Sequence, residues 1–249
     1  RTLSDKPGHD RQESSAFAIH SHWQANDDFD VVSLMSYADS DLEYGYDEDW
    51  AFPSICAGQE CDGWEYNSED NYLRDRDNST LDIKLVSKQP LRLLGKTTGW
   101  VLGVYARQQD EQLLRQYTYN TGDFTSSFET DNRALYGQFD IDIADEWILT
   151  AGLRIENRDA TYSDSDGVAH SVDEDLWGGR IALQYQLDKR TMVYGLVSRG
   201  YKAGGVNSDS SLSAQDREFD TELMWNIEIG IKGSWLDAVS YTHLRAHET

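Results

Sequence analysis

The sequence lacks any apolar run of the length that a transmembrane helix needs, which is about 18 residues. Helical membrane spans are therefore excluded, whereas a membrane strand hides its apolar residues at every second position and leaves no such run. Positive charge is also scarce, because 22 Lys and Arg stand against 45 Asp and Glu, for a formal net charge of −23. Nucleic acid is not expected as a partner, since its phosphates need a basic surface.

Cysteine is nearly absent. The two that occur, Cys56 and Cys61, lie inside an acidic and aromatic segment. A zinc site would need more ligands than this pair supplies. We predict a local disulfide formed in an oxidising compartment, with two free thiols as the alternative.

Catalytic arrangements are missing as well. Acid pairs such as Asp140 and Asp142 alternate on one predicted strand face, with no apolar pocket to raise a carboxyl pKa. The sequence has no Ser/His/Asp spacing, phosphate loop or dinucleotide-binding motif. We therefore expect no enzyme activity, no cofactor and no metal.

The strongest pattern that is present covers residues 134–158, where polarity alternates strictly in two arms around a short polar break. Leu135 and Phe139 share one face of the first arm, while Leu153 and Arg154 fall on opposite faces of the second. Each arm has about ten residues, the length that a tilted strand needs to cross a bilayer. A half-buried sheet in a soluble sandwich would alternate in the same way, so this hairpin alone leaves both folds open.

Similar alternation predicts about nine strands, and their connections decide between the two folds. Short breaks fall near residues 25, 90, 145 and 189, and long polar segments cover 40–75, 108–132, 159–174 and 203–217. Outer-membrane barrels have short periplasmic turns on one rim and long extracellular loops on the other. The sequence therefore predicts an all-β fold, an antiparallel transmembrane β-barrel segment with its long loops outside the cell.

The alternation also assigns side chains to the two sides of such a barrel. Aromatic residues near the strand ends are expected to form interfacial girdles, namely Trp23, Trp100, Trp147, Trp177 and Trp235. The residues predicted to face outer-membrane lipid are Leu149, Leu153, Leu183, Ile227 and Ile229. Those predicted to face the lumen are Arg154, Arg180, Gln184 and Glu228.

Three blocks carry a resemblance to a known family. They are YGQFDIDIADEWILTAGLR within 135–158, VYGLVSRGYKAGGVN at 193–207, and FDTELMWNIEIGIKG at 219–233. In order and spacing they resemble the barrel domain of TonB-dependent outer-membrane receptors. Val206 departs from the pattern, since an aromatic residue is usual at that place in the glycine turn. The resemblance implies a 22-stranded barrel closed by an N-terminal plug, in the outer membrane of a Gram-negative bacterium.

The resemblance also predicts how the chain is divided. Residues 1–238 are expected to be a partial receptor barrel without the plug, the TonB-contacting box and the last strands. The opening RTLSDKPGHD lacks a start methionine and a signal peptide, which predicts a truncated chain. Residues 239–249 do not alternate and are expected to be a non-native tail. A piece of this kind is not expected to transport anything by itself.

Such receptors import ferric siderophores, haem, cobalamin or sugars, and TonB supplies the energy through the plug. An iron chelate is the expected ligand because that class is the most frequent in the family. A sugar or cobalamin receptor, a passive porin or structural barrel, and a soluble carbohydrate-binding sandwich are the alternatives. The candidate ligand residues are Arg154, Arg158, Arg180, Trp50, Trp64, Tyr66, Tyr201 and Lys202.

Two opposing explanations apply to these candidates. The inward arginines suit an anionic chelate, but they would equally form a ladder of lumenal ion pairs with Glu156 and neighbouring acids. The aromatic residues suit flat or aryl groups, but they would equally pack inside a long loop. The sequence leaves both pairs of alternatives open.

Overall fold

A single curved antiparallel sheet makes up most of the computed structural model, which describes residues 4–56, 66–93, 95–207, 212–235 and 240–245. Each long strand pairs with the next one in the chain, so the sheet is a meander without crossovers. In order the long strands are β1 (His9–Trp23), β2 (Phe29–Asp47), β3 (Glu69–Ser87), β5 (Lys96–Tyr117), β6 (Phe124–Ala144), β7 (Trp147–Asp164), β8 (Ala169–Asp188), β9 (Thr191–Lys202), β12 (Glu222–Trp235) and β13 (Ser240–Arg245).

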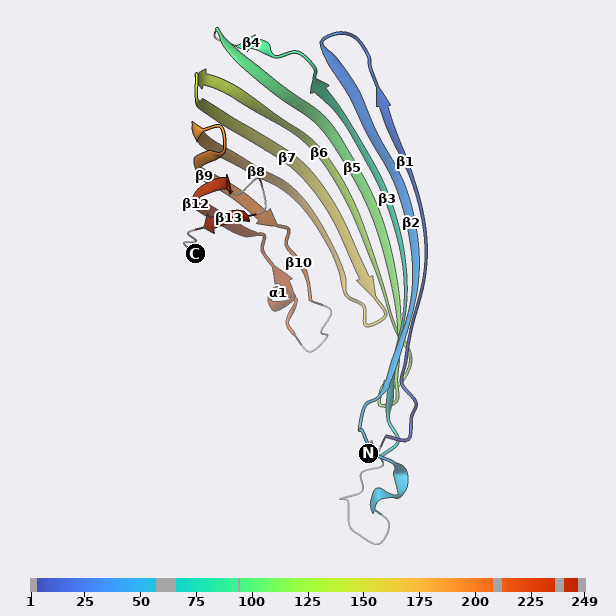
Figure 1. Cartoon of the computed structure of the whole chain (residues 1–249). Coiled ribbons are helices and arrows are strands. Elements are labelled where there is room, and N and C mark those ends of the chain that lie inside the picture. Colours follow the sequence, from blue (N-terminus) through green and yellow to red (C-terminus); the bar gives the residue numbers. More distant parts are fainter. Residues whose placement is uncertain (1–3, 57–65, 94, 208–211, 236–239, 246–249) are drawn as a thin grey trace.

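The remaining elements are short and lie between these strands. They are the 3₁₀ helix η1 (Pro53–Cys56), β4 (Leu91–Leu93) on β5, the pair β10 (Gly205–Val206) and β11 (Glu218–Phe219), and helix α1 (Ala214–Arg217). No helix in the described ranges is long and apolar enough to cross a membrane. The sheet bends into an open, incomplete barrel wall with β1 and β13 at its edges (Figure 1). Within the described residues, the connections β1–β2, β6–β7 and β8–β9 lie at one rim, and the longer connections β2–β3 and β9–β12 lie at the other, together with the short turn between β7 and β8.

The predicted strands are confirmed, but the prediction of long loops was wrong at three places. Both ends of the predicted loop at 40–75 are strand, because β2 continues to Asp47 and β3 begins at Glu69, with unbroken pairing between them. The predicted loops at 108–132 and 159–174 are likewise largely strand. These segments are polar on both faces and therefore show no amphipathic period, yet backbone hydrogen bonds to neighbouring strands still hold them in the sheet.

Strands β2, β3, β5 and β6 are consequently much longer than a membrane is thick. β5 has 22 residues, which at about 3.4 Å per residue gives a length of roughly 75 Å. The apolar band of an outer-membrane barrel is only about 25 Å tall. We call the polar parts of β2, β3, β5 and β6 beyond this band, at 38–47, 69–78, 107–117 and 124–132, the extension; it forms the long narrow arm in Figure 1.

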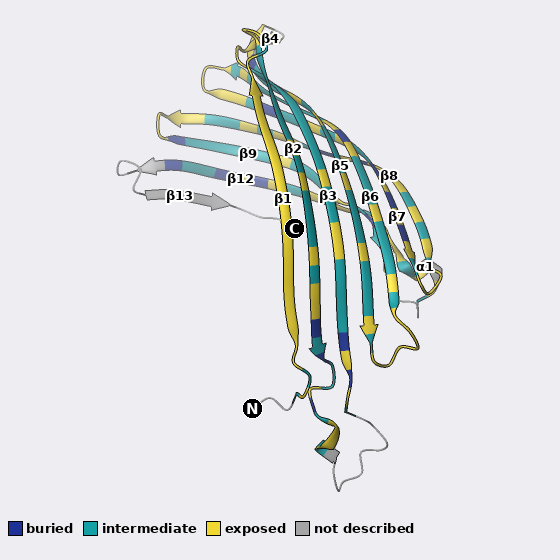
Figure 2. Cartoon of the chain, turned by 90° about the vertical axis from the view of Figure 1, so that its right-hand side faces the viewer, coloured by how far each residue is buried: buried dark blue, intermediate teal, exposed yellow. Residues whose placement is uncertain are grey.

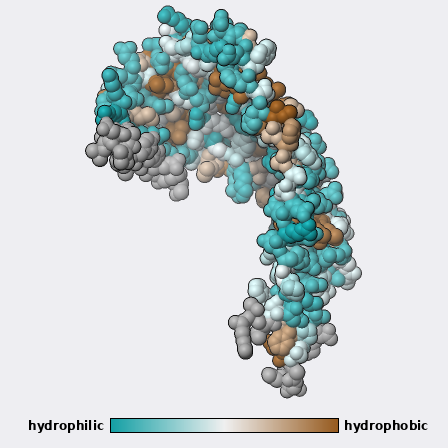
Figure 3. Space-filling model, turned by 45° about the vertical axis from the view of Figure 1, so that its right-hand side comes forward, coloured by the Kyte–Doolittle hydropathy of each residue, from teal (hydrophilic) through white to brown (hydrophobic). Residues whose placement is uncertain are grey.

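The two faces of the sheet have the predicted characters. Ile181 and Ile229 are 61% and 71% exposed on the outer face, and Leu153 and Ile227 are exposed with them. Side chains crowd together on the concave face of a curved sheet, and that face contains buried Arg158 as well as Glu228, which is only 5% exposed. In Figures 2 and 3, exposed and apolar residues recur over the curved part of the sheet, whereas the extension is mostly hydrophilic.

Tyrosines on the concave face cover glycines of neighbouring strands. The ring of Tyr136 on β6 lies where a Cβ of Gly103 on β5 would be, and the ring of Tyr194 on β9 does the same at Gly230 on β12. Each ring thereby fills the space that the glycine of the neighbouring strand leaves open. The Tyr136 hydroxyl donates to Asp82 at 2.6 Å, which connects three strands.

The final strand differs from the sequence expectation in one respect. Ser240–Arg245 pair with β12 and extend the sheet by a tenth long strand. Backbone pairing does not require alternating polarity, so the lack of a period-2 pattern did not reveal this strand. The origin of residues 239–249 as a non-native tail stays a prediction.

Candidate functional site

The most developed polar and aromatic arrangement lies on the concave face of the extension. Two-residue spacing places Tyr44 with Tyr46 on one face of β2, Asp70 with Tyr72 on β3, and Arg115 with Tyr117 on β5. The strand register places these residues in two rows across β2, β3 and β5. One row is Tyr44, Tyr72 and Arg115, and the other is Tyr46, Asp70 and Tyr117. We call these six residues the Asp70 cluster.

Asp70 is the centre of the cluster and is only 1% exposed. Arg115 donates to both of its carboxylate oxygens, from Nε at 2.8 Å and from Nη2 at 2.6 Å. The hydroxyls of Tyr72 and Tyr46 donate to Oδ2 at 2.9 and 3.3 Å. A bidentate guanidinium and two hydroxyls satisfy the buried carboxylate, so its charge is compensated within the wall.

The rings of the cluster form a continuous aromatic surface around this ion pair. The Arg115 guanidinium lies 5.2 Å from the centre of the Tyr72 ring and 5.0 Å from that of Tyr117. Tyr44 lies 5.7 Å from Tyr46 and 6.4 Å from Tyr72, centre to centre, and is 43% exposed. A surface of this kind can bind flat apolar or aryl groups through ring contacts and hydroxyl hydrogen bonds.

The environment of Tyr72 leads to a prediction about alkaline pH. Burial, followed by its hydrogen bond to Asp70 and the charge of that carboxylate, raises the pKa of Tyr72 to about 12. A raised folded-state pKa means that the protonated form stabilises the fold fully below the ordinary tyrosine pKa of about 10. This contribution is lost as pH rises toward 12.

The expected result is that Tyr72 ionises near pH 12 and above the ordinary tyrosine pKa of about 10, and that Tyr72→Phe flattens the loss of stability between about pH 10 and pH 12. Tyrosinate absorbance and urea unfolding across that range would measure both effects. Tyr119→Phe, which alters an exposed tyrosine at the end of β5, is the control. Equal pH profiles for the wild type and Tyr72→Phe would contradict the assignment.

A second polar group occupies the concave wall nearer the tight turns. Arg154 forms an ion pair with Glu156 at 2.6 Å, and its guanidinium lies 4.7 Å from the centre of the Tyr105 ring. The Tyr201 hydroxyl donates to Glu156 at 2.7 Å, from the part of β9 that has separated from β8. Arg180 donates to Gln138 across two strands. Arg154 and Arg180 line one open cavity of about 620 Å³.

Arg158 makes its contacts at a different part of the concave wall from Arg154 and Arg180. Its guanidinium pairs with Glu174 at 3.0 Å and donates to the carbonyl oxygen of Gly204 at 3.2 Å. Glu174 also accepts from the Thr221 hydroxyl. The arginine therefore fixes both ends of the connection between β9 and β12 to the wall, and it does not line the cavity shared by Arg154 and Arg180.

The predicted ligand residues are thus brought together only in part. Lys202 is largely exposed and pairs with Glu222 at 3.7 Å, away from the Asp70 cluster. Trp50 is 68% exposed just beyond β2, with a backbone φ of 57°, and Tyr66 is half-buried just before β3. Trp64 and Cys61 lie outside the described residues, and Cys56 ends η1, so the disulfide stays a prediction.

The ion pairs at Arg154 and Arg158 correspond to the alternative of a lumenal salt-bridge ladder. Sequence reasoning also missed Asp70 and Arg115, because both fall in segments interpreted as loops. A signal existed, since tyrosines two residues apart at 44 and 46, and at 117 and 119, place rings on one face of an extended chain.

Each long strand pairs with the next one in the chain, the outer face carries an apolar band, and the concave face is polar. This combination, with strands extended beyond the band at one rim, is typical of the wall of an outer-membrane β-barrel. A family model described as "TonB dependent receptor-like, beta-barrel" matches residues 1–246. The chain belongs to this family.

Solved structures with the same fold include receptors for iron complexes. One is the ferric yersiniabactin uptake receptor FyuA from Yersinia pestis, with a TM-score of 0.69 and 16% identity over 92% of this chain. Another is the ferric-catecholate import receptor Fiu from E. coli K12, with a TM-score of 0.70 and 13% identity over 93%. The copper transporter OprC is also similar, with a TM-score of 0.66 and 12% identity over 90%. This chain spans 34%, 39% and 36% of those three proteins.

Proposed function

We propose that the complete receptor containing this chain lies in the outer membrane of a Gram-negative bacterium and imports a ferric siderophore or a similar iron complex. Energy would come from TonB through a plug domain outside the present sequence. The family supports the class of transporter, and the iron-complex receptors among the similar structures support the class of ligand. The Asp70 cluster is the observation on this chain itself that favours the proposal.

The geometry favours an aryl-bearing ligand over a simple anion. Three arginines of the concave wall already form ion pairs within the protein: Arg115 with Asp70, Arg158 with Glu174, and Arg154 with Glu156. A net charge of −23 repels anions over a Debye length of about 8 Å. Tyrosine rings and hydroxyls, in contrast, remain open on the extension at Tyr44. We therefore place the initial contact with the ligand at the Asp70 cluster and not at the lumenal arginines.

Growth under iron starvation tests the proposal. A strain whose only iron receptor is the complete protein should grow on catecholate-type ferric chelates and should fail without TonB. Tyr44→Ala removes an exposed ring from the cluster and should weaken ligand binding about three- to tenfold, the value of one aromatic contact. Trp225→Ala, on the outer face of β12, is the control and should leave binding unchanged.

Other outcomes would point to the alternatives. Growth that does not need TonB would indicate a passive porin, and uptake of copper, cobalamin or a maltodextrin with no growth on any ferric chelate would indicate another transporter of the same family. A carbohydrate-binding sandwich is no longer an alternative, because the main sheet forms a single layer and the chain belongs to the receptor-barrel family.

A further inference from the structure

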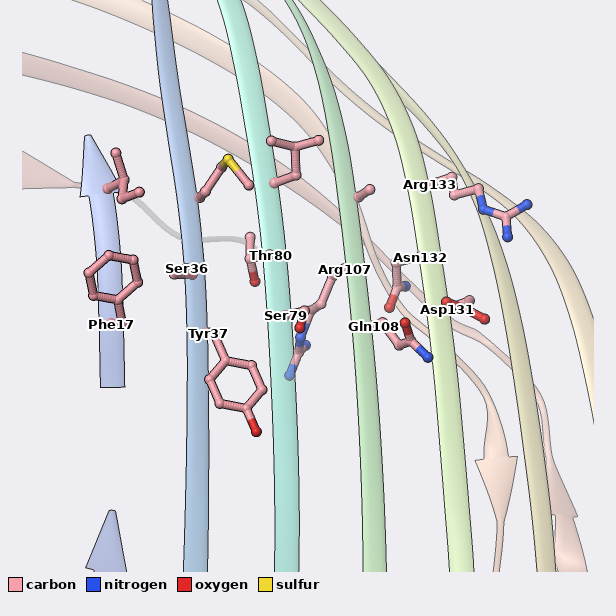
Figure 4. Close-up of a pocket in the computed structure, with 14 residues that line it drawn as sticks. Phe17, Ser36, Tyr37, Ser79, Thr80, Arg107, Gln108, Asp131, Asn132 and Arg133 are labelled. Carbon is pink, nitrogen blue, oxygen red and sulfur yellow. The ribbon is translucent and has the colours of Figure 1, made fainter. Parts of the chain in front are cut away.

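Two grooves cross the outer face of the sheet at the boundary between the apolar band and the extension. One, of about 430 Å³, runs from Phe17 on β1 past Met35 and Leu81 to Ala106 and Arg133 (Figure 4). The other, of about 670 Å³, continues from the same Ala106 and Arg133 past Leu135 and Ile155 to Trp177 on β8. Together they form one interrupted trough across the strands, with Arg133 at the point where the two grooves meet.

Arg133 differs from the arginines of the concave wall. Its register partners are Ala106 on β5 and Asn157 on β7, and Leu135, two residues further along the same face, is 56% exposed. The Arg133 side chain is exposed and, within the part of the chain that the structure describes, makes no ion pair or hydrogen bond. Arg115, Arg154 and Arg158 each pair with a carboxylate. Arg133 is therefore available for an anion outside the protein.

The surroundings restrict what kind of anion can reach it. On the membrane side of Arg133 the lining is apolar, because Leu135, Ile155 and Trp177 form one row across the register and all three are exposed. On the side of the extension the lining becomes polar at Gln108 and Asp131. A ligand that fits both sides carries hydrocarbon chains and a charged headgroup, which is the chemistry of a membrane lipid whose headgroup lies at the height of Arg133.

We propose that this trough binds an anionic lipid of the outer leaflet. The headgroup phosphate contacts Arg133, and the acyl chains contact the apolar residues that line the two grooves. The inference rests on the proposed outer-membrane location. The guanidinium matches a phosphate through charge-assisted, bidentate hydrogen bonds. Ala106 leaves room for a chain between the two grooves, because it is the smallest side chain that lines both.

Two carboxylates near Arg133 are expected to weaken the binding of a lipid phosphate. Asp131 lies two residues before Arg133 on the same face, and Asp175 lines the second groove. Both repel a phosphate, so Arg133 accommodates one phosphate group and not an extended polyanion. Removing Asp131 should therefore strengthen lipid binding, whereas removing Arg133 should weaken it.

The test is lipid retention by the complete receptor in mixed micelles, measured by native mass spectrometry. The two probes are a bis-phosphorylated, multiply acylated glycolipid and its dephosphorylated form with the same chains. Arg133→Gln should lower the affinity for the phosphorylated probe about tenfold, the value of one hydrogen-bonded charge contact. Arg133→Lys should retain most of it, Asp131→Asn should raise it, and Ala106→Trp should lower the affinity for both probes by filling the trough.

Arg92→Gln, at an exposed arginine of β4 near the tight turns, is the matched control and should change nothing. Equal retention by Arg133→Gln and the wild type, or equal retention of the two probes by the wild type, would overturn the proposal. Tagging of Leu135 by a lipid-soluble carbene reports separately whether the outer face is in the membrane. Ferric-chelate uptake by Arg133→Gln should stay at the wild-type level, so a failure of the receptor function would be seen independently.

Discussion

Ile181→Arg is expected to destabilise the membrane-inserted receptor by about 2–4 kcal/mol, the cost of an arginine on the lipid face near the bilayer midplane. Ile181 is 61% exposed on the outer face of β8, between Ala151 and Val197 of the neighbouring strands. No acid is placed opposite it on either neighbour, so the guanidinium would have to face hydrocarbon or distort the bilayer. Urea unfolding of the complete receptor in lipid vesicles measures the difference directly.

The matched control for this substitution lies three residues further along the same strand. Gln184 is half-buried on the concave face, beside Tyr194 and Ile148 in the register. Gln184→Arg introduces the same side chain into a polar lumen and is expected to change stability by less than about 1 kcal/mol. If Gln184→Arg were the more damaging of the two, the assignment of the faces would be reversed.

Asp70→Ala is expected to destabilise the extension by about 2–3 kcal/mol and to abolish the order of the tyrosine surface. The substitution leaves Arg115 and the hydroxyls of Tyr46 and Tyr72 without their shared acceptor. The expected cost is below the roughly 3–5 kcal/mol of a fully buried ion pair, because the Arg115 side chain is 34% exposed and can regain water. Hydrogen exchange of β3 and β5 beyond the membrane band would show faster opening, together with weaker ligand binding.

Asp75→Ala on the same strand is the control for loss of a carboxylate. Asp75 lies on the other face of β3, where partial desolvation of the carboxyl, and then the charge of neighbouring Asp41, raises its pKa. Removing it relieves like-charge repulsion across the register pair Asp41 and Asp75. Exchange rates should stay unchanged or become slower in Asp75→Ala. Faster exchange in this variant, equal to that in Asp70→Ala, would show that the extension depends on net charge and not on the Asp70 cluster.

Alternating polarity alone identified the strands inside the apolar band, their faces and their antiparallel order. Lipid on one side and water on the other impose a period of two on the residues, so Leu153, Arg154, Ile227 and Glu228 could be assigned before the structure was known. For the same reason, the sequence pattern did not reveal the strands of the extension. Where both faces of a strand contact water, its residues need not alternate in polarity, and the segment has the polar composition of a loop.

The candidate site was less accessible to the sequence for a related reason. The aromatic residues near 44–72 were recognised, but Asp70 and Arg115 are separated by 45 positions and meet only through the register of β3 and β5. The inward arginines were likewise identified by their face, while their partners depend on which carboxylate the neighbouring strand presents. Composition and period therefore determined the class of fold and the side on which each residue lies. Only the tertiary structure decided which charges cancel, because strand register sets which side chains on neighbouring strands come within reach of one another.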